Sequence, residues 1–351
     1  MTVFGQTLKA GLRAVAVAGV AFATLATAPA TAQAPAQATG TLDAIRARGT
    51  LVCGVNTGLA GFAQPNSQGV WNGFEVDYCR ALAIAIFNDV TKVRYVPTTA
   101  QVRFTALQSA EVDVLARNTT WTLSRDTSLG LDFTATNFYD GQGFMVKTSL
   151  NLKSAKELEG ATICVQPGTT TEQNLTDWSR ANRIRFTPVV IERLEEVVSA
   201  YINNRCDAYT TDVSGLAATR SAQPRPADHF ILPDVISKEP LALGVRQGDA
   251  RFADITRWVH YLLLSAEEFG ITQANVDQMA NDPRPEVQRM LGRNGGLGQM
   301  LGLDNAWAVN VIKATGNYGE IFQRHLIPIG VQRGPNALWT QGGLQYSPPF
   351  R

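Results

Sequence analysis

The chain has 351 residues, of which 45% are hydrophobic and 17% are charged. This composition is typical of a globular protein and too apolar for a disordered one, and the length favours two domains or lobes. The formal net charge of +1 excludes a strong overall field that would hold nucleic acid or an anionic membrane surface.

The segment 1–34 has the layout of a secretory signal peptide. Lys9 and Arg13 precede an uncharged, mostly apolar run at 14–26, and the small residues at 32–34 fit a cleavage site. The run is short for a membrane span, and no later segment approaches the ~18 apolar residues that a span needs. We therefore expect export, cleavage and a mature chain that does not span a membrane. An uncleaved N-terminal anchor is the alternative.

After a linker at 35–40, strand-like and helix-like segments alternate along the first half of the chain. Apolar or alternating runs rich in β-branched residues indicate strands, and apolar residues at helical spacing indicate the helices between them. The expected strands are 51–55, 92–99 and 112–116, and the expected helices are 42–48, 75–87 and 103–111. This order is the pattern of a parallel sheet with helices on both faces.

The same order recurs in the second half, which predicts an α/β protein of two similar lobes. Here the expected strands are 161–165, 185–191 and 206–211, and the expected helices are 169–182 and 192–204. Extended joins near 143–149 and 238–245 would return the chain to the first lobe, where 251–271 is expected to form a long helix. The expected domains are lobe 1 at 41–146 and 243–275, lobe 2 at 147–242, and a C-terminal helical extension at 276–351 packed on a lobe.

Four cysteines remain after the signal segment: Cys53, Cys79, Cys164 and Cys206. An even number in an exported chain indicates disulfides, and four cysteines allow three pairings. Pairing within each lobe is the simplest model, and four buried free thiols are the alternative. Because no cysteine lies in a CxxC pair or near a histidine, neither a zinc site nor a cysteine nucleophile is expected.

Polar side chains follow the expected strands, at the edge of an open α/β sheet where ligands bind. The residues at or just after these ends include Leu59, Asn118, Thr120, Thr169, Thr170 and Asp212. With Arg125 nearby, they offer a cation, a carboxylate and several donors. This set fits an α-amino acid zwitterion, because Arg grips a carboxylate through two N–H bonds and Asp accepts from an ammonium group.

Structural readings of the same residues remain open. Arg125 beside Asp126 also fits a surface ion pair, and hydroxyl residues at a helix start are common caps. Three aromatic residues fit either the wall of a ligand side-chain pocket or the core: Trp121, Phe62 and Trp71.

Several segments resemble the general L-amino-acid-binding proteins of bacterial ABC transporters, a long-chain branch of the polar-amino-acid solute-binding family. These segments are NTTWTLSRDTSLGLDF, YDGQGFMV, CVQPGTTTE, YTTDVSGL, ISKEPL and NALWTQGGLQY. They lie in the family's order, and the resemblance covers the chain from about residue 40 to 351.

The resemblance implies a type II, clam-shell periplasmic-binding-protein fold whose two lobes close on a ligand. It implies that Arg125 holds the ligand α-carboxylate and that Asp212 accepts from the α-ammonium group. The implied main-chain and hydroxyl donors are Asn118, Thr120 and Thr170.

The resemblance also supports the pair Cys164–Cys206. Leu59 stands where many relatives have an aromatic residue that stacks on the ligand, and an aliphatic wall there is compatible with broad specificity.

The expected function is that of a monomeric periplasmic protein that captures L-amino acids and delivers them to the membrane subunits of an ABC transporter, without cofactor or metal. One alternative is a periplasmic enzyme on the same scaffold, such as a dehydratase of cyclic amino acids, with Glu172 as the acid or base. The other is an amino-acid sensor domain that reports to a separate receptor.

Overall fold

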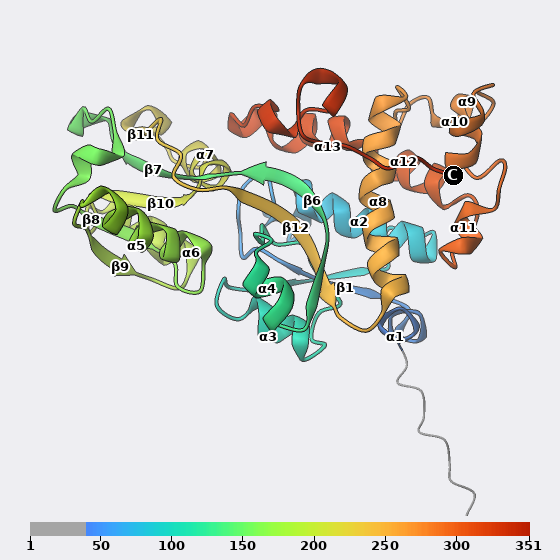
Figure 1. Cartoon of the computed structure of the whole chain (residues 1–351), viewed down its shortest axis with the longest axis horizontal. Helices are drawn as coiled ribbons and strands as arrows, with labels where there is room; N and C mark the ends of the chain where they lie inside the picture. The colour runs from blue at the N-terminus through green and yellow to red at the C-terminus, as the bar shows by residue number, and fades with distance from the viewer. Residues whose placement is uncertain (1–39) are drawn as a thin grey trace, which may run out of the picture. The chain divides into compact units, whose positions relative to one another are not determined.

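The computed structural model describes residues 40–351, so the expected signal peptide at 1–34 lies outside the described residues. Over this range the chain builds two five-stranded sheets and one two-stranded ribbon, with helices between the strands (Figure 1). The ribbon pairs β2 (Gln64–Pro65) with β3 (Trp71–Asn72).

The first sheet has the strand order β4-β1-β5-β12-β6. Its strands are β1 (Leu51–Val55), β4 (Val93–Pro97), β5 (Val114–Leu115), β6 (Leu131–Asp140) and β12 (Glu239–Arg246). β1 is buried at every position and pairs in parallel with β4 and β5, whereas β12 and β6 run antiparallel to their neighbours. The carboxyl ends of β1 and β5 therefore lie side by side.

Helices cover this sheet on the sides that its apolar residues face. They are α1 (Thr41–Arg48), α2 (Phe74–Phe87), α3 (Arg103–Gln108), α4 (Leu123–Ser128) and α8 (Ala250–Glu268). α2 packs on β1, and α8 packs on β6 and β12. Gly73 begins α2 at φ 141°, and a Cβ at this position would lie 2.1 Å from the Phe62 carbonyl oxygen, so only glycine fits there.

The second sheet has the strand order β11-β7-β10-β8-β9. Its strands are β7 (Gln142–Lys147), β8 (Thr162–Val165), β9 (Thr187–Val190), β10 (Ala208–Asp212) and β11 (His229–Ile231), and its helices are α5 (Thr170–Asn182), α6 (Leu194–Ile202) and α7 (Val213–Ser221). β8 runs parallel to β9 and β10, while β7 is antiparallel to β10 and β11. Each sheet is thus mixed, because the strands that connect the two sheets enter antiparallel to the βαβ succession.

The chain changes sheets at Gly141, between the end of β6 and the start of β7. The sequence placed this join at 143–149 and extended lobe 1 to 146, which is wrong by several residues. The apolar, extended run there is not a connector but β7, which is buried from Gln142 to Val146 and hydrogen-bonded on both sides. The return lies between β11 and β12.

Each disulfide joins two cysteines of the same half of the chain. Cys53 in β1 is bonded to Cys79 in α2, with Cα atoms 6.2 Å apart. Cys164 in β8 is bonded to Cys206, just before β10, with Cα atoms 5.6 Å apart. No free cysteine occurs in residues 40–351.

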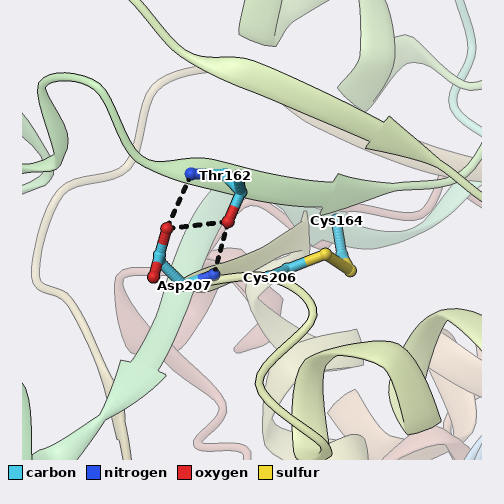
Figure 2. Close-up of a disulfide and its surroundings, with 4 residues drawn as sticks. All are labelled: Thr162, Cys164, Cys206 and Asp207. Atoms are coloured by element: carbon cyan, nitrogen blue, oxygen red, sulfur yellow. Dashed lines mark hydrogen bonds between the residues drawn. A yellow bond between two sulfur atoms is a disulfide. The ribbon is translucent and has the colours of Figure 1, made fainter.

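A second tie lies beside the Cys164–Cys206 bond (Figure 2). The Thr162 N–H and hydroxyl donate to the Asp207 carboxylate at 2.8 and 2.7 Å, and the Asp207 N–H donates to the Thr162 hydroxyl oxygen at 3.1 Å. Together the disulfide and this pair fix the start of β10 against β8.

Residues after 275 fold as short helices against the helices of the first sheet. They include α9 (Val276–Met279), α10 (Pro285–Met290), α11 (Leu297–Met300), α12 (Trp307–Thr315) and α13 (Tyr318–His325). Asn336 accepts from the Tyr139 N–H at 2.6 Å and donates to the Tyr139 carbonyl at 2.9 Å, and the Tyr318 hydroxyl donates to the Asn137 carbonyl at 3.0 Å. The extension therefore holds β6 just before the chain changes sheets.

Within residues 40–351, no helix has both the length and the apolar sequence that a membrane crossing requires.

Removing the Cys164–Cys206 bond with the double change Cys164→Ala and Cys206→Ala is expected to lower the free energy of unfolding by roughly 4 kcal/mol, because the bond closes a loop of sequence separation 42 in the unfolded chain. Urea unfolding followed by circular dichroism measures the loss. The Cys53→Ala, Cys79→Ala pair is the control and should lose slightly less, since its separation is 26. A loss below about 1 kcal/mol would contradict the chain-entropy account.

Candidate functional site

The carboxyl ends of β5, β8 and β10 meet, together with the loop after β4, around one small polar cavity. It is lined by Ala100, Arg103, Arg117, Asn118, Thr120, Gln166, Thr169, Thr170, Thr171, Thr211 and Asp212. Five of the sequence-predicted residues are in this set: Asn118, Thr120, Thr169, Thr170 and Asp212. The cavity measures about 20 Å³, which is room for roughly one water molecule. Both sheets contribute to its walls.

Glu239, the first residue of β12, joins the two sides of the cavity. Its side chain is buried, and Oε2 accepts from the hydroxyls of Thr120 at 2.6 Å and Thr170 at 2.8 Å. Oε1 accepts from Asn174 Nδ2 at 2.7 Å and from Ser237 Oγ at 2.5 Å. Thr120 follows β5 of the first sheet, whereas Thr170 and Asn174 belong to α5 beside the second. One carboxylate thus ties both halves of the protein together.

These hydrogen bonds change the role that the sequence gave to two threonines. A threonine hydroxyl has one proton, and both Thr120 and Thr170 give it to Glu239. Their hydroxyl oxygens can still accept but cannot donate to a ligand carboxylate. The donors left on this side are the main-chain N–H groups of Thr170 and Thr171, which have no partner within the helix because they lie in its first turn. Thr169 caps the same helix by accepting from the Glu172 N–H at 3.1 Å.

Arg125 is turned inward and buried. Its N–H donates to the hydroxyl of Thr122, the cap of α4, at 3.3 Å, and its Nη1 donates to the Thr120 carbonyl at 3.0 Å. The guanidinium carbon lies 5.2 Å from the centre of the Phe104 ring. Asp126 instead accepts from the Phe133 N–H at 3.5 Å, so the surface ion pair that was an alternative reading of Arg125 is wrong.

Burial lowers the pKa of Arg125, and the charges of Glu239 and Asp212 oppose that shift. Arg125 does not line the cavity itself, but its Nη1 is hydrogen-bonded to the carbonyl of Thr120, which does. Such a cation favours an anion at the cavity.

Asp212 ends β10 and is 5% exposed. Burial raises the pKa of its carboxyl well above the usual value, and the nearby charges of Asp140 and Glu239 raise it further. A hydrogen bond from Asn118 and the charge of Arg103 act in the opposite direction. A ligand ammonium group would relieve this repulsion, because it brings a positive charge and three donors.

The structure adds charged residues that the sequence analysis gave no role: Glu75, Arg103, Arg117, Asp140 and Glu239. Burial lowers the pKa of Arg117 to about 10, and its Nε donates to the Thr98 carbonyl at 2.9 Å. Burial raises the pKa of Glu75 to about 7, and one of its oxygens accepts from the Asn118 N–H. Arg117 lies two residues after the end of β5 and next to Asn118, so the strand-end rule that selected Asn118 applies to it as well.

Leu59 and Trp121 do not line this cavity. Leu59 is 6% exposed and lies in the core beneath a separate groove of about 260 Å³ formed with α6 and α7. Trp121 is half exposed and stacks on Phe133, with ring centres 5.8 Å apart. Their proposed contact with a ligand side chain stays a prediction.

Among the described residues, no group of three or more His, Cys, Asp or Glu side chains is placed to hold a metal ion. Glu172, the acid or base of the enzyme alternative, accepts from the Gly168 N–H at 3.1 Å at the start of α5. The cavity instead combines cations, a carboxylate and main-chain donors, which is a set suited to binding a small zwitterion.

Residues 51–291 match the family model of the bacterial extracellular solute-binding proteins, family 3. The chain belongs to this family. Its fold is accordingly the type II periplasmic-binding-protein fold, and the residues after 291 extend beyond the family model.

The relatives cover almost the whole chain. The general L-amino acid-binding periplasmic protein AapJ of Rhizobium johnstonii is 56% identical over 91% of this chain and 95% of its own length. The glutamate/glutamine/aspartate/asparagine-binding protein BztA of Rhodobacter capsulatus is 55% identical over the same shares. A periplasmic binding protein of an ABC transporter from Brucella ovis, solved with glutathione bound, is 57% identical with a TM-score of 0.87, covering 89% of this chain and 99% of that one. These relatives are binding proteins and not enzymes.

In the ligand-free protein, Asp212→Asn is expected to raise the melting temperature at pH 8, because it removes a buried carboxylate that Asp140 and Glu239 repel. The folded-state pKa of Asp212 is raised, so its ionisation destabilises the fold at high pH, and protonation relieves this as the pH falls through the folded pKa. The advantage of the variant should therefore shrink from pH 8 to pH 5 in thermal unfolding.

The matched control is Asp177→Asn, an exposed position of α5, which should shift the melting temperature little at any pH. A lower melting temperature for Asp212→Asn at pH 8 would show that Asp212 is stabilised by its surroundings and would contradict this account.

Proposed function

We propose that this protein is a periplasmic solute-binding protein that captures L-amino acids and delivers them to the membrane subunits of an ABC transporter. The observation that carries the proposal is the buried carboxylate of Asp212 in the cavity wall together with the buried cation of Arg125, whose Nη1 donates to the carbonyl of the wall residue Thr120. The names of AapJ and BztA, both amino-acid-binding proteins, support it.

In this proposal, charged groups of the protein bind the α-carboxylate and the α-ammonium group that all amino acids share. The ligand α-carboxylate accepts from Arg125 and from the main-chain N–H groups at the start of α5. The α-ammonium group donates to Asp212 and to the hydroxyl oxygens of Thr120 and Thr170, whose protons Glu239 holds. Asn118 orients Asp212 through its hydrogen bond. A ligand that lacks either charged group would leave a buried charge unpaired and bind poorly.

Binding in this proposal requires the two halves to separate and close. A cavity of about 20 Å³ is smaller than any amino acid, so the described arrangement is the closed one. The hydrogen bonds that must break include those of Glu239 with Thr170 and Asn174 and that of the Thr99 hydroxyl with Glu192. The lobes would turn about Gly141 and the segment 232–238, where the chain passes between sheets, and residues 276–351 would move with lobe 1. The ligand then shifts the open–closed population, and the transporter recognises the closed form.

A wide range of ligands is expected because only the α-carboxylate and α-ammonium groups are bound by Arg125 and Asp212. AapJ is named for general L-amino acid binding and BztA for four acidic and amide amino acids. Glutathione, bound in the Brucella ovis structure, carries a free α-amino and α-carboxylate on its γ-glutamyl residue. All of these share the zwitterion that we assign to Arg125 and Asp212.

Export through the signal peptide at 1–34, a periplasmic location and a monomeric state belong to this proposal. The enzyme alternative is not favoured, because AapJ and BztA bind solutes. A sensor would bind the same ligands, and deletion of the transporter's membrane subunits distinguishes the two: uptake is lost if the protein serves transport.

The first experiment is a thermal-shift panel on refolded, ligand-stripped mature protein with the twenty L-amino acids. Ligand at a hundred times its dissociation constant should add about 2.7 kcal/mol of stability, which moves the midpoint by roughly 2–4 °C or somewhat more at this size. Shifts with several amino acids are expected. No shift with any of them would exclude the amino-acid reading.

In the same panel, Arg125→Met should abolish the shifts, because losing one partner of a buried ion pair costs about 3–5 kcal/mol, or two or more orders of magnitude in affinity. Arg180→Met, an exposed arginine of α5, is the matched control. Affinities of Arg125→Met within threefold of wild type would remove Arg125 from the site.

Glu239→Gln is expected to weaken binding of every amino acid by a similar factor of about ten, because an amide has only one acceptor oxygen: when that oxygen accepts from the two threonines, the amide NH2 faces the Asn174 NH2 and that hydrogen bond is lost. Isothermal titration across the panel gives the factors, and small-angle X-ray scattering should show a more open ligand-free protein. Unchanged affinities would mean that Glu239 does not contribute to closure.

A further inference from the structure

Arg103, the first residue of α3, lines the cavity with a side chain that the protein does not fully pair. The residue is 3% exposed, and its Nε is buried without a hydrogen-bond partner within the described residues. A guanidinium has five N–H donors in a rigid plane and cannot lose its charge in a protein. A buried donor on a charged group is unfavourable when it has no acceptor. A ligand that places a hydrogen-bond acceptor at Arg103 Nε would therefore be favoured.

The surroundings of Arg103 concentrate positive charge. Its guanidinium carbon lies 4.8 Å from the centre of the Phe104 ring, and that of Arg125 lies 5.2 Å from the same centre. Burial and the charges of Arg117 and Arg125 lower the pKa of Arg103, and only Asp212 and Glu75 oppose them. A ligand with an extra negative charge or acceptor would therefore be favoured at this end of the cavity.

A bare zwitterion does not supply that acceptor once the other groups are assigned. The α-carboxylate occupies Arg125, and the α-ammonium group occupies Asp212. Arg117 already donates to the Thr98 carbonyl at 2.9 Å and to Asn118 Oδ1 at 3.4 Å. Arg103 is the cavity-lining cation that this assignment leaves without an acceptor for its Nε.

We propose that Arg103 binds an acceptor on the ligand side chain, so that amino acids with a side-chain carboxylate or amide bind more tightly than aliphatic ones. The inference rests on the proposed function and refines it. Arg125 and Asp212 bind the α-carboxylate and α-ammonium groups that all amino acids share, and Arg103 determines the preference among side chains. A carboxylate matches the guanidinium through two parallel hydrogen bonds, and an amide oxygen accepts one or two. An aliphatic side chain leaves Nε unpaired in a dry site.

The test compares L-glutamate, L-glutamine and L-leucine by isothermal titration against ligand-stripped wild type, Arg103→Met and Arg103→Lys. The wild type should bind glutamate at least tenfold more tightly than leucine. Arg103→Met should lose roughly 10- to 100-fold for glutamate and glutamine and less than threefold for leucine. Arg103→Lys keeps the charge without the planar fork and should retain part of the glutamate preference. Arg94→Met, an exposed arginine of β4, is the matched control and should change none of the affinities.

Equal losses for leucine and glutamate in Arg103→Met would overturn the inference, because they would show that Arg103 only supports the charge of Asp212. A wild type that binds all three ligands equally would overturn it as well. If Arg103→Met does not fold, the glutamate-to-leucine ratio of Arg103→Lys decides: an unchanged ratio overturns the inference and a smaller one supports it. Failure of the proposed function is a different result, in which the wild type binds none of the three.

Discussion

Charge buried between the two sheets is the constraint on which the rest of this structure depends. A buried charge is unfavourable unless a partner compensates it, and carboxylates and guanidiniums from both sheets meet at one cavity. The protein satisfies Glu239 by itself, with four hydrogen bonds from four different side chains. It leaves Asp212 against two like charges and Arg103 with an unpaired Nε. Both of these residues line the cavity.

This arrangement needs a rigid background, because a small displacement would let the charges reach water or one another. The disulfide Cys164–Cys206 and the hydrogen bonds of Thr162 with Asp207 hold β10 on β8, and so fix the position of Asp212. In the first sheet, Asn336 of the C-terminal extension holds β6 up to Tyr139. In the proposed closure, motion about Gly141 and the return segment 232–238 would bring two preformed walls together.

The fold and half of the site follow from local sequence, and the rest depends on contacts that no local pattern encodes. Asn118 and Asp212 could be predicted because parallel strands end at one edge of a sheet, so their place follows from the strand order alone. Glu239 could not, since its role arises where the returning strand passes between two threonines far away in the chain. Arg103 looked like an ordinary first residue of a short helix. The join was misplaced because the apolar run of β7 has the extended character of a connector and the burial of a strand.

The same electrostatics links recognition to closure. In the proposed open form, water would solvate Asp212 and the arginines, and closing would remove that water, so closure without a ligand would concentrate uncompensated charge in a cavity of about 20 Å³. An amino acid supplies a carboxylate and an ammonium group at the moment when they are needed, and its binding energy is therefore expressed as a shift toward the closed form. In the proposed function the Glu239 carboxylate does not contact the ligand, so its hydrogen bonds would favour closure equally for all ligands. Discrimination between ligands must then come from a group that meets only their side chains, and among the charged residues that line the cavity Arg103 is the one whose hydrogen-bonding capacity the protein leaves open.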